Sequence, residues 1–65
     1  MANNLHEIRK SRGMTQAELA RETGINRVTI ARYELGLINP GSENLIKLMA
    51  ALRCSADELL QKKAG

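Results

Sequence analysis

The 65-residue chain has no phenylalanine, no tryptophan, one tyrosine and one cysteine. Without aromatic rings a core must be built from leucine, isoleucine, valine, alanine and methionine, so an aliphatic core is expected. A single cysteine excludes an internal disulfide and fits a reducing compartment. One histidine and one cysteine are too few for the familiar zinc clusters, so we expect no metal site and no cofactor.

The chain also lacks an apolar run that approaches the ~20 residues needed to span a bilayer. Its first residues are polar, which gives no sign of a signal peptide. Basic residues are spread over several segments, which argues against a helix lying on a membrane surface. No serine, histidine and aspartate arrangement and no glycine-rich phosphate loop is present, so no enzyme is expected. These absences favour one soluble, cytoplasmic domain over residues 1–65.

The net charge is +3, and it is unevenly distributed. Residues 1–33 carry six basic and three acidic side chains, whereas residues 34–65 carry four of each. A basic half is typical of a surface that faces a polyanion. An excess of three charges is also ordinary for solubility, so charge alone leaves both interpretations open.

Apolar residues recur at helical spacing and strand alternation is absent, which predicts five short helices. The first is expected over about residues 3–12, the second between Thr15 and Gly24, the third over 27 to about 35, the fourth from near Ser42, and the fifth from the segment 55–58 to Leu60. Residues 61–65 are expected to fray. The prediction is an all-α, compact five-helix bundle.

Cap signals set the ends of these helices. The segments TQAE, residues 15–18, and SADE, residues 55–58, have the spacing of capping boxes, in which the first side chain and the fourth satisfy each other's backbone amides. Asn26 is a good N-cap for the third helix. Gly13 and Gly24 can take the positive φ that ends a helix.

Only Gly24, Ile25 and Asn26 separate the second and third helices. So short a connection forces a steep crossing, which is the geometry of a helix-turn-helix. The motif is expected over about residues 15–35. Its inward-facing residues are predicted to be Ala17, Leu19, Ala20, Ile25, Ile30 and Tyr33.

The segment TQAELARETGINRVTIARYELG resembles the helix-turn-helix of the phage-repressor and Cro-like regulators, the Xre family. LHEIRKSRGM resembles the first helix of that lambda repressor-like domain, and NPGSENLIKLMAAL and SADELL resemble its fourth and fifth. The resemblance covers about residues 5–60. It implies a sequence-specific, DNA-binding transcriptional regulator, most simply a repressor that binds an inverted-repeat operator in double-stranded DNA as a homodimer.

The resemblance also implies roles for individual residues. Arg27, Val28 and Arg32 match the base-contacting positions, where arginine binds guanine O6 and N7 and valine packs on a thymine methyl. Contacts to phosphates or water alone are the alternative for both arginines. Gln16 matches a residue that binds a phosphate and braces the recognition helix. The further candidates for backbone contacts are Asn26, Thr29, Arg12 and Lys10.

Other matched positions imply structural roles. Arg9 and Glu34 match an ion pair between the first and third helices, whereas His6 is expected to be exposed. The dimer surface of related proteins lies towards the C-terminal helices, which indicates Leu59, Leu60 and Cys54; packing into the core is the alternative for Cys54.

The sequence departs from the family pattern in a few places. Leu35 stands where a polar residue is common, and Leu37 and Ile38 are apolar in a loop that is usually more polar. These two loop residues either pack onto the core or help to form a partner surface. Arg53 occupies a helix end where glycine or asparagine is frequent, which predicts backbone strain.

Two other functions stay open at this point. An antitoxin would bind DNA and also mask a toxin, but it would usually need more chain after the last helix. A protein-interaction module on the same fold would have lost DNA binding. The basic first half and the outward Arg27 and Arg32 argue against this second alternative.

Overall fold

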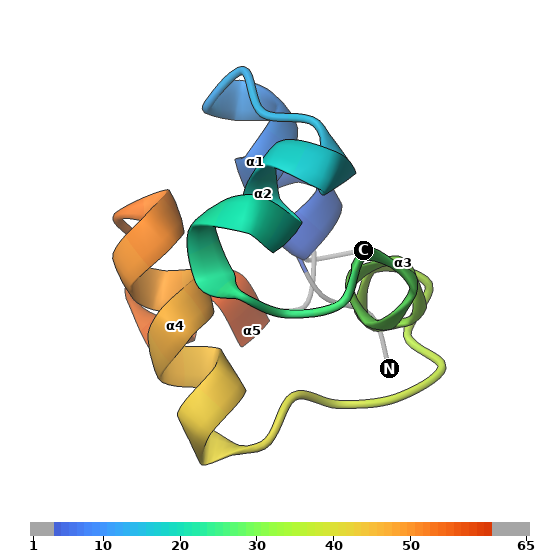
Figure 1. Cartoon of the computed structure of the whole chain (residues 1–65). Helices are drawn as coiled ribbons and strands as arrows, with labels where there is room; N and C mark the ends of the chain where they lie inside the picture. The colour runs from blue at the N-terminus through green and yellow to red at the C-terminus, as the bar shows by residue number, and fades with distance from the viewer. Residues whose placement is uncertain (1–3, 61–65) are drawn as a thin grey trace.

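The computed structural model describes residues 4–60, and these form five helices (Figure 1). In chain order they are α1 (Leu5–Ser11), α2 (Gln16–Thr23), α3 (Arg27–Glu34), α4 (Ser42–Leu52) and α5 (Ala56–Leu60). The predicted all-α architecture is confirmed, with helix bounds within about two residues of those expected. The predicted fraying of residues 61–65 lies outside the described residues.

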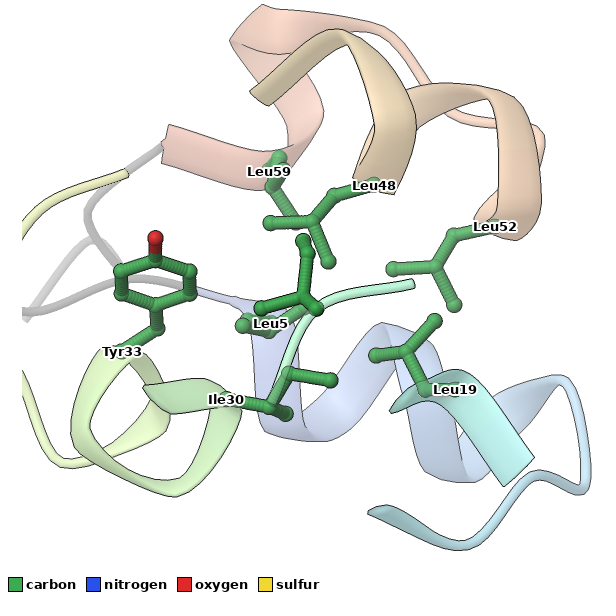
Figure 2. Close-up of a cluster of buried hydrophobic side chains, with 8 residues drawn as sticks. Leu5, Leu19, Ile30, Tyr33, Leu48, Leu52 and Leu59 are labelled. Carbon is green, nitrogen blue, oxygen red and sulfur yellow. The ribbon is translucent and has the colours of Figure 1, made fainter. Parts of the chain in front are cut away.

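The core is assembled from all five helices (Figure 2). It is aliphatic, as predicted, apart from Tyr33, whose hydroxyl accepts a hydrogen bond from Asn44 Nδ2 at 2.9 Å. The buried hydrophobic residues are Leu5, Leu19, Ile25, Ile30, Tyr33, Leu48, Leu52 and Leu59. α2 packs against both α3 and α4. The helix-turn-helix is therefore held in place by contacts with the rest of the domain.

Both predicted capping boxes are present. Thr15 Oγ1 accepts from the amide of Glu18 at 3.0 Å, and the Thr15 amide donates to Glu18 Oε1 at 3.0 Å. Hydrogen bonds from the backbone and the side chain of Thr15 lower the pKa of the Glu18 carboxyl. Ser55 and Glu58 repeat the arrangement at the start of α5, with both bonds at 3.1 Å. The two helix starts are therefore set by local sequence.

The expectations for Ala17 and Leu59 need correction, and the structure rules out one of the two alternatives for Leu37 and Ile38. Ala17 is exposed, because it lies on the outer side of α2, opposite Leu19. Leu37 and Ile38 do not pack onto the core: they are 68% and 41% exposed, because the chain between α3 and α4 runs over the outside of the domain (Figure 1). Leu59 cannot supply an exposed dimer contact, since α5 turns it into the core and leaves it 2% exposed.

Leu60 and Cys54 are the other two residues predicted for the dimer surface. Leu60 is half-buried. Cys54 is half-buried and packs against the core, as in the core-filling alternative. Burial raises the pKa of the Cys54 thiol, and the nearby Glu58 acts in the same direction. The thiol is thereby kept in its protonated, unreactive form.

Arg53 ends α4 with φ 54° and ψ 49°, and it is the one non-glycine residue of the described chain with positive φ. The predicted strain is therefore confirmed. A left-handed conformation costs a residue with a β-carbon about 1–2 kcal/mol.

Candidate nucleic-acid interface

The turn between α2 and α3 is held by its own side chains. Gly24 takes φ 75°, and its amide donates to Ala20 O at 2.8 Å. The buried Thr23 hydroxyl donates to Leu19 O at 2.8 Å and accepts from the Ile25 amide at 3.2 Å. These hydrogen bonds hold the turn in one conformation and so fix the crossing of α2 and α3.

Asn26 begins α3 as predicted. Its Oδ1 accepts from the Val28 amide at 2.8 Å, which satisfies one of the free amides at the helix start. The cap occupies the carbonyl side of the amide group and leaves its NH₂ side for other partners. Thr29, in the same turn, is half-buried.

The two sides of α3 differ in character. Ile30 and Tyr33 are 0% and 4% exposed and face the core. Arg27, Val28 and Arg32 are all exposed, and Val28 is 57% exposed. Val28, Ala31, Arg32 and Leu35 follow one another at helical spacing, which makes a single outward stripe with Arg27 beside its start. The three predicted base-contacting residues therefore share the outer face of α3.

The predicted ion pair joins α1 to the end of α3. Arg9 Nε lies 2.6 Å from Glu34 Oε2, and Arg9 Nη2 lies 3.2 Å from Glu34 Oε1. The two side chains are 9% and 5% exposed. Arg9 Nη1 also donates to Met14 O at 2.6 Å, which ties the turn after α1 to the same group. This arrangement fixes the C-terminal end of α3.

Glu34 has two further partners. His6 Nδ1 lies 3.0 Å from Glu34 Oε1, and Gln16 Nε2 donates to the same oxygen at 3.1 Å. Burial raises the pKa of Glu34, but the hydrogen bonds from Arg9, His6 and Gln16 outweigh it, so the pKa is lowered overall. Glu34 is therefore ionised at neutral pH and joins α1, α2 and α3.

The expectation for His6 was incomplete. The side chain is 55% exposed, yet its ring reaches Glu34 and lies 3.1 Å from Arg9 Nη2. The available signal was spacing, because His6 and Arg9 are three residues apart and thus on one face of α1. Gln16 braces the end of α3, as the resemblance implied, whereas its phosphate contact stays a prediction.

Arg12, a candidate for DNA-backbone contacts, has hydrogen-bond partners within the domain. Its Nε donates to Leu52 O at 2.8 Å and its Nη2 to Arg53 O at 3.4 Å. The guanidinium thus satisfies carbonyls at the C-terminal end of α4, where a positive charge is favourable. Lys10 is exposed and stays a candidate.

Residues 4–60 show neither a membrane-spanning helix nor a metal-binding cluster. Within that range no helix has the length and apolarity needed to cross a membrane. Nor do three or more histidine, cysteine or acidic side chains gather there in a way that could hold a metal ion.

In this chain α2 and α3 cross and are joined by a three-residue turn, and the outer face of α3 is basic. This arrangement is that of the helix-turn-helix class of proteins. A family model described as "Helix-turn-helix" matches residues 5–59. The chain therefore belongs to this helix-turn-helix family, of the Xre and Cro/C1 type.

The relatives include phage repressors. Repressor protein C2 of Salmonella phage P22 is 36% identical over 61 residues, which are 94% of this chain and 28% of that protein. The cryptic phage CTXphi transcriptional repressor RstR of Vibrio cholerae is 45% identical over 51 residues, which are 78% of this chain and 46% of that protein. The chain thus spans less than half the length of either relative.

A solved structure agrees with the fold. The crystal structure of the P22 c2 repressor protein, in complex with synthetic operator 9T in the presence of Tl⁺, matches this chain with a TM-score of 0.84 and 36% identity. The match covers 89% of this chain and 88% of that chain. The lambda repressor-like fold is confirmed.

Proposed function

We propose that this protein is a transcriptional repressor whose α3 enters the major groove of double-stranded DNA. The observation that carries this proposal is the outer face of α3, where Arg27, Val28 and Arg32 are exposed together. A hydrophobic residue between two arginines suits the floor of a major groove, which offers guanine acceptors and thymine methyl groups. The P22 c2 repressor, which has the same fold, was solved in complex with an operator.

Around these base contacts, other residues would set the register on the DNA backbone. Gln16 stands at the start of α2, where free amides and the helix dipole favour a phosphate. The other residues proposed to contact the DNA backbone are Asn26, Thr29 and Lys10, whereas Arg12 is no longer proposed for this role. Such contacts position the protein without reading sequence.

We further propose that the protein acts as a homodimer in the cytoplasm. A two-fold dimer places two α3 helices about 34–36 Å apart, one turn of DNA, and so reads an inverted repeat. Leu59 is excluded from the interface by its burial, which leaves the half-buried Leu60 and Cys54 of the earlier set. Exposed apolar side chains at Leu37, Ile38 and Ile46 are also available to a partner.

A second protein partner, such as a toxin, would use the same kind of surface. The exposed Leu37 and Ile38 are the observation that favours a protein contact in addition to DNA. A module that binds protein and has lost DNA binding is less consistent with exposed Arg27 and Arg32 on α3.

The proposal is tested by selecting bound duplexes from a randomised DNA pool at near-physiological salt, where non-specific phosphate binding is weakened. Enrichment of an inverted repeat is expected. The variant R32A should lose much of the enrichment. The matched control is K47A, which also removes one positive charge but at a site outside α3. Lys47 is an exposed lysine on α4 whose Nζ lies 3.5 Å from Glu43 Oε1. Failure of the folded wild-type protein to enrich any sequence would overturn the proposal.

A further inference from the structure

His6 has surroundings that its proposed role as a surface residue does not explain. Its ring nitrogen Nδ1 lies 3.0 Å from Glu34 Oε1 and 3.1 Å from Arg9 Nη2. Glu34 can only accept a hydrogen bond when ionised, and Arg9 can only donate one. Nδ1 can donate to Glu34 or accept from Arg9, but it cannot do both at once. The lowered pKa of Glu34 keeps its carboxylate ionised and therefore an acceptor, so Nδ1 is the donor.

Donation from Nδ1 to Glu34 has a consequence for the other ring nitrogen. In a neutral ring with its proton on Nδ1, Nε2 is an acceptor, whereas in a protonated ring Nε2 is also a donor. The side chain is 55% exposed, so the ring remains accessible to a ligand. An anion at Nε2 would therefore favour the protonated ring, held on its other side by Glu34.

The position of the ring brings it close to the proposed DNA surface. Gln16 Nε2 and His6 Nδ1 both contact Glu34 Oε1, so these two side chains are close neighbours. A surface cleft of about 410 Å³ is lined by His6, Gln16, Ala31, Glu34 and Leu35. Ala31 and Leu35 belong to the outward stripe of α3, so the cleft continues the surface that carries Val28 and Arg32.

We propose that His6 is a phosphate-binding residue of the DNA interface, and that it binds the DNA backbone in its protonated form beside Gln16. The inference rests on the proposed function, since it requires α3 to be the DNA-facing helix. Neutral histidine would leave Glu34 and Arg9 balanced, with no net charge in the group. Protonated histidine makes the group positive by one charge, which suits a phosphate.

The charged groups around the ring come from several elements. Arg9 and Lys10, three and four residues after His6, are on α1, and Glu34 is on α3. α2 contributes the uncharged amide of Gln16. None of these side chains other than histidine is of a type that changes charge near neutral pH, so the pH dependence in that range is assigned to His6.

The test compares wild-type protein with H6Q and H6K on the duplex enriched by selection, at about pH 8 and about pH 6. Glutamine can still donate to Glu34 but carries no charge, and lysine is charged at both pH values. Wild-type affinity is expected to rise about tenfold on going to the lower pH, because binding takes up a proton. H6Q should change by less than about twofold, and H6K should bind about equally at both.

Two further readouts separate a phosphate contact from a structural role. The first readout is the slope of the logarithm of the affinity against the logarithm of the salt concentration. At the lower pH this slope should be steeper for the wild type than for H6Q, by the amount expected for about one released counterion. His6 is the only histidine of the chain, so its ring signals in NMR can be followed without ambiguity. Duplex binding should move the midpoint of the ring titration to higher pH.

The outcomes distinguish the inference from the function on which it rests. If all three proteins bind the duplex and show the same change with pH, His6 does not bind a phosphate, while the proposed function stands. If wild-type protein enriches no duplex and binds none at either pH, both fall. A ring titration that is unchanged by the duplex would also overturn the inference.

Discussion

The α1 region (residues 5–12) and α3 each carry two arginines, and the structure uses the two pairs in opposite ways. Arg9 and Arg12 of the α1 region are engaged inside the molecule, with Glu34, Met14 O and the carbonyls that end α4. For the guanidinium groups of Arg27 and Arg32 no hydrogen bond or ion pair is found within residues 4–60, and both side chains are exposed. Positive charge alone therefore does not mark a DNA contact; the partner of each guanidinium decides its role.

The largest expected effect comes from the internal pair. R9A would leave the Glu34 carboxylate buried without its cation, and removing one partner of a buried pair typically costs about 3–5 kcal/mol. The free energy of unfolding, measured with urea, checks this value. Adding E34Q removes the orphaned charge and should recover part of the loss. If R9A unfolds at the wild-type urea concentration, the pair does not hold α3 in place.

The next effect belongs to the outer pair and concerns DNA. R27A should lose about 1–3 kcal/mol of binding at one base pair of each half-site and relax the preference there. Stability should be unchanged, because the side chain is exposed. Affinities for the selected duplex and its single-base variants supply the measurement. Equal weakening on every sequence would make Arg27 a phosphate ligand instead.

Arg12 is expected to give a smaller effect with the character of the internal pair. R12A removes the hydrogen bonds to Leu52 O and Arg53 O and should cost about 1 kcal/mol of stability. It should leave the salt dependence of DNA binding unchanged. A salt slope lower by about one would return Arg12 to the phosphate-binding set.

The smallest effect is a dependence of stability on pH. The pKa of Glu34 is lower in the folded protein than in the unfolded chain, so its contribution is fully present above the unfolded value. That contribution is lost as the pH falls through the folded value, since the unfolded chain takes up the proton first. Thermal unfolding of E34Q should therefore vary less with pH over the acidic range than that of the wild type. Parallel curves would contradict this assignment.

Features set by neighbours in the chain were predictable from the sequence. The capping boxes at Thr15 and Ser55, the N-cap at Asn26 and the short turn at Gly24 depend on residues within a few positions of each other. Their hydrogen-bonding groups are fixed by spacing, so the helix starts and the crossing of α2 and α3 follow. The Arg9–Glu34 pair came from the family resemblance and is present.

Features set by tertiary contacts were not predictable in the same way. Arg12 reaches the end of α4, forty residues away in sequence, and nothing local to Arg12 indicates that partner. In a helix as short as α5, either Leu59 or Leu60 could have faced the core, and packing decides for Leu59. The contact of His6 with Glu34 required knowing where the end of α3 lies.

The comparison of the two arginine pairs can be tested most directly by NMR. Each arginine carries its own Nε–H signal, which reports on the surroundings of its guanidinium, and the spectrum would be recorded while the selected duplex is added. The account predicts that the signals of Arg27 and Arg32 shift most on binding, while that of Arg12 stays in place and that of Arg9, which lies beside His6, shifts less. Shifts at Arg9 and Arg12, with Arg27 and Arg32 unchanged, would contradict it and move the DNA surface away from α3.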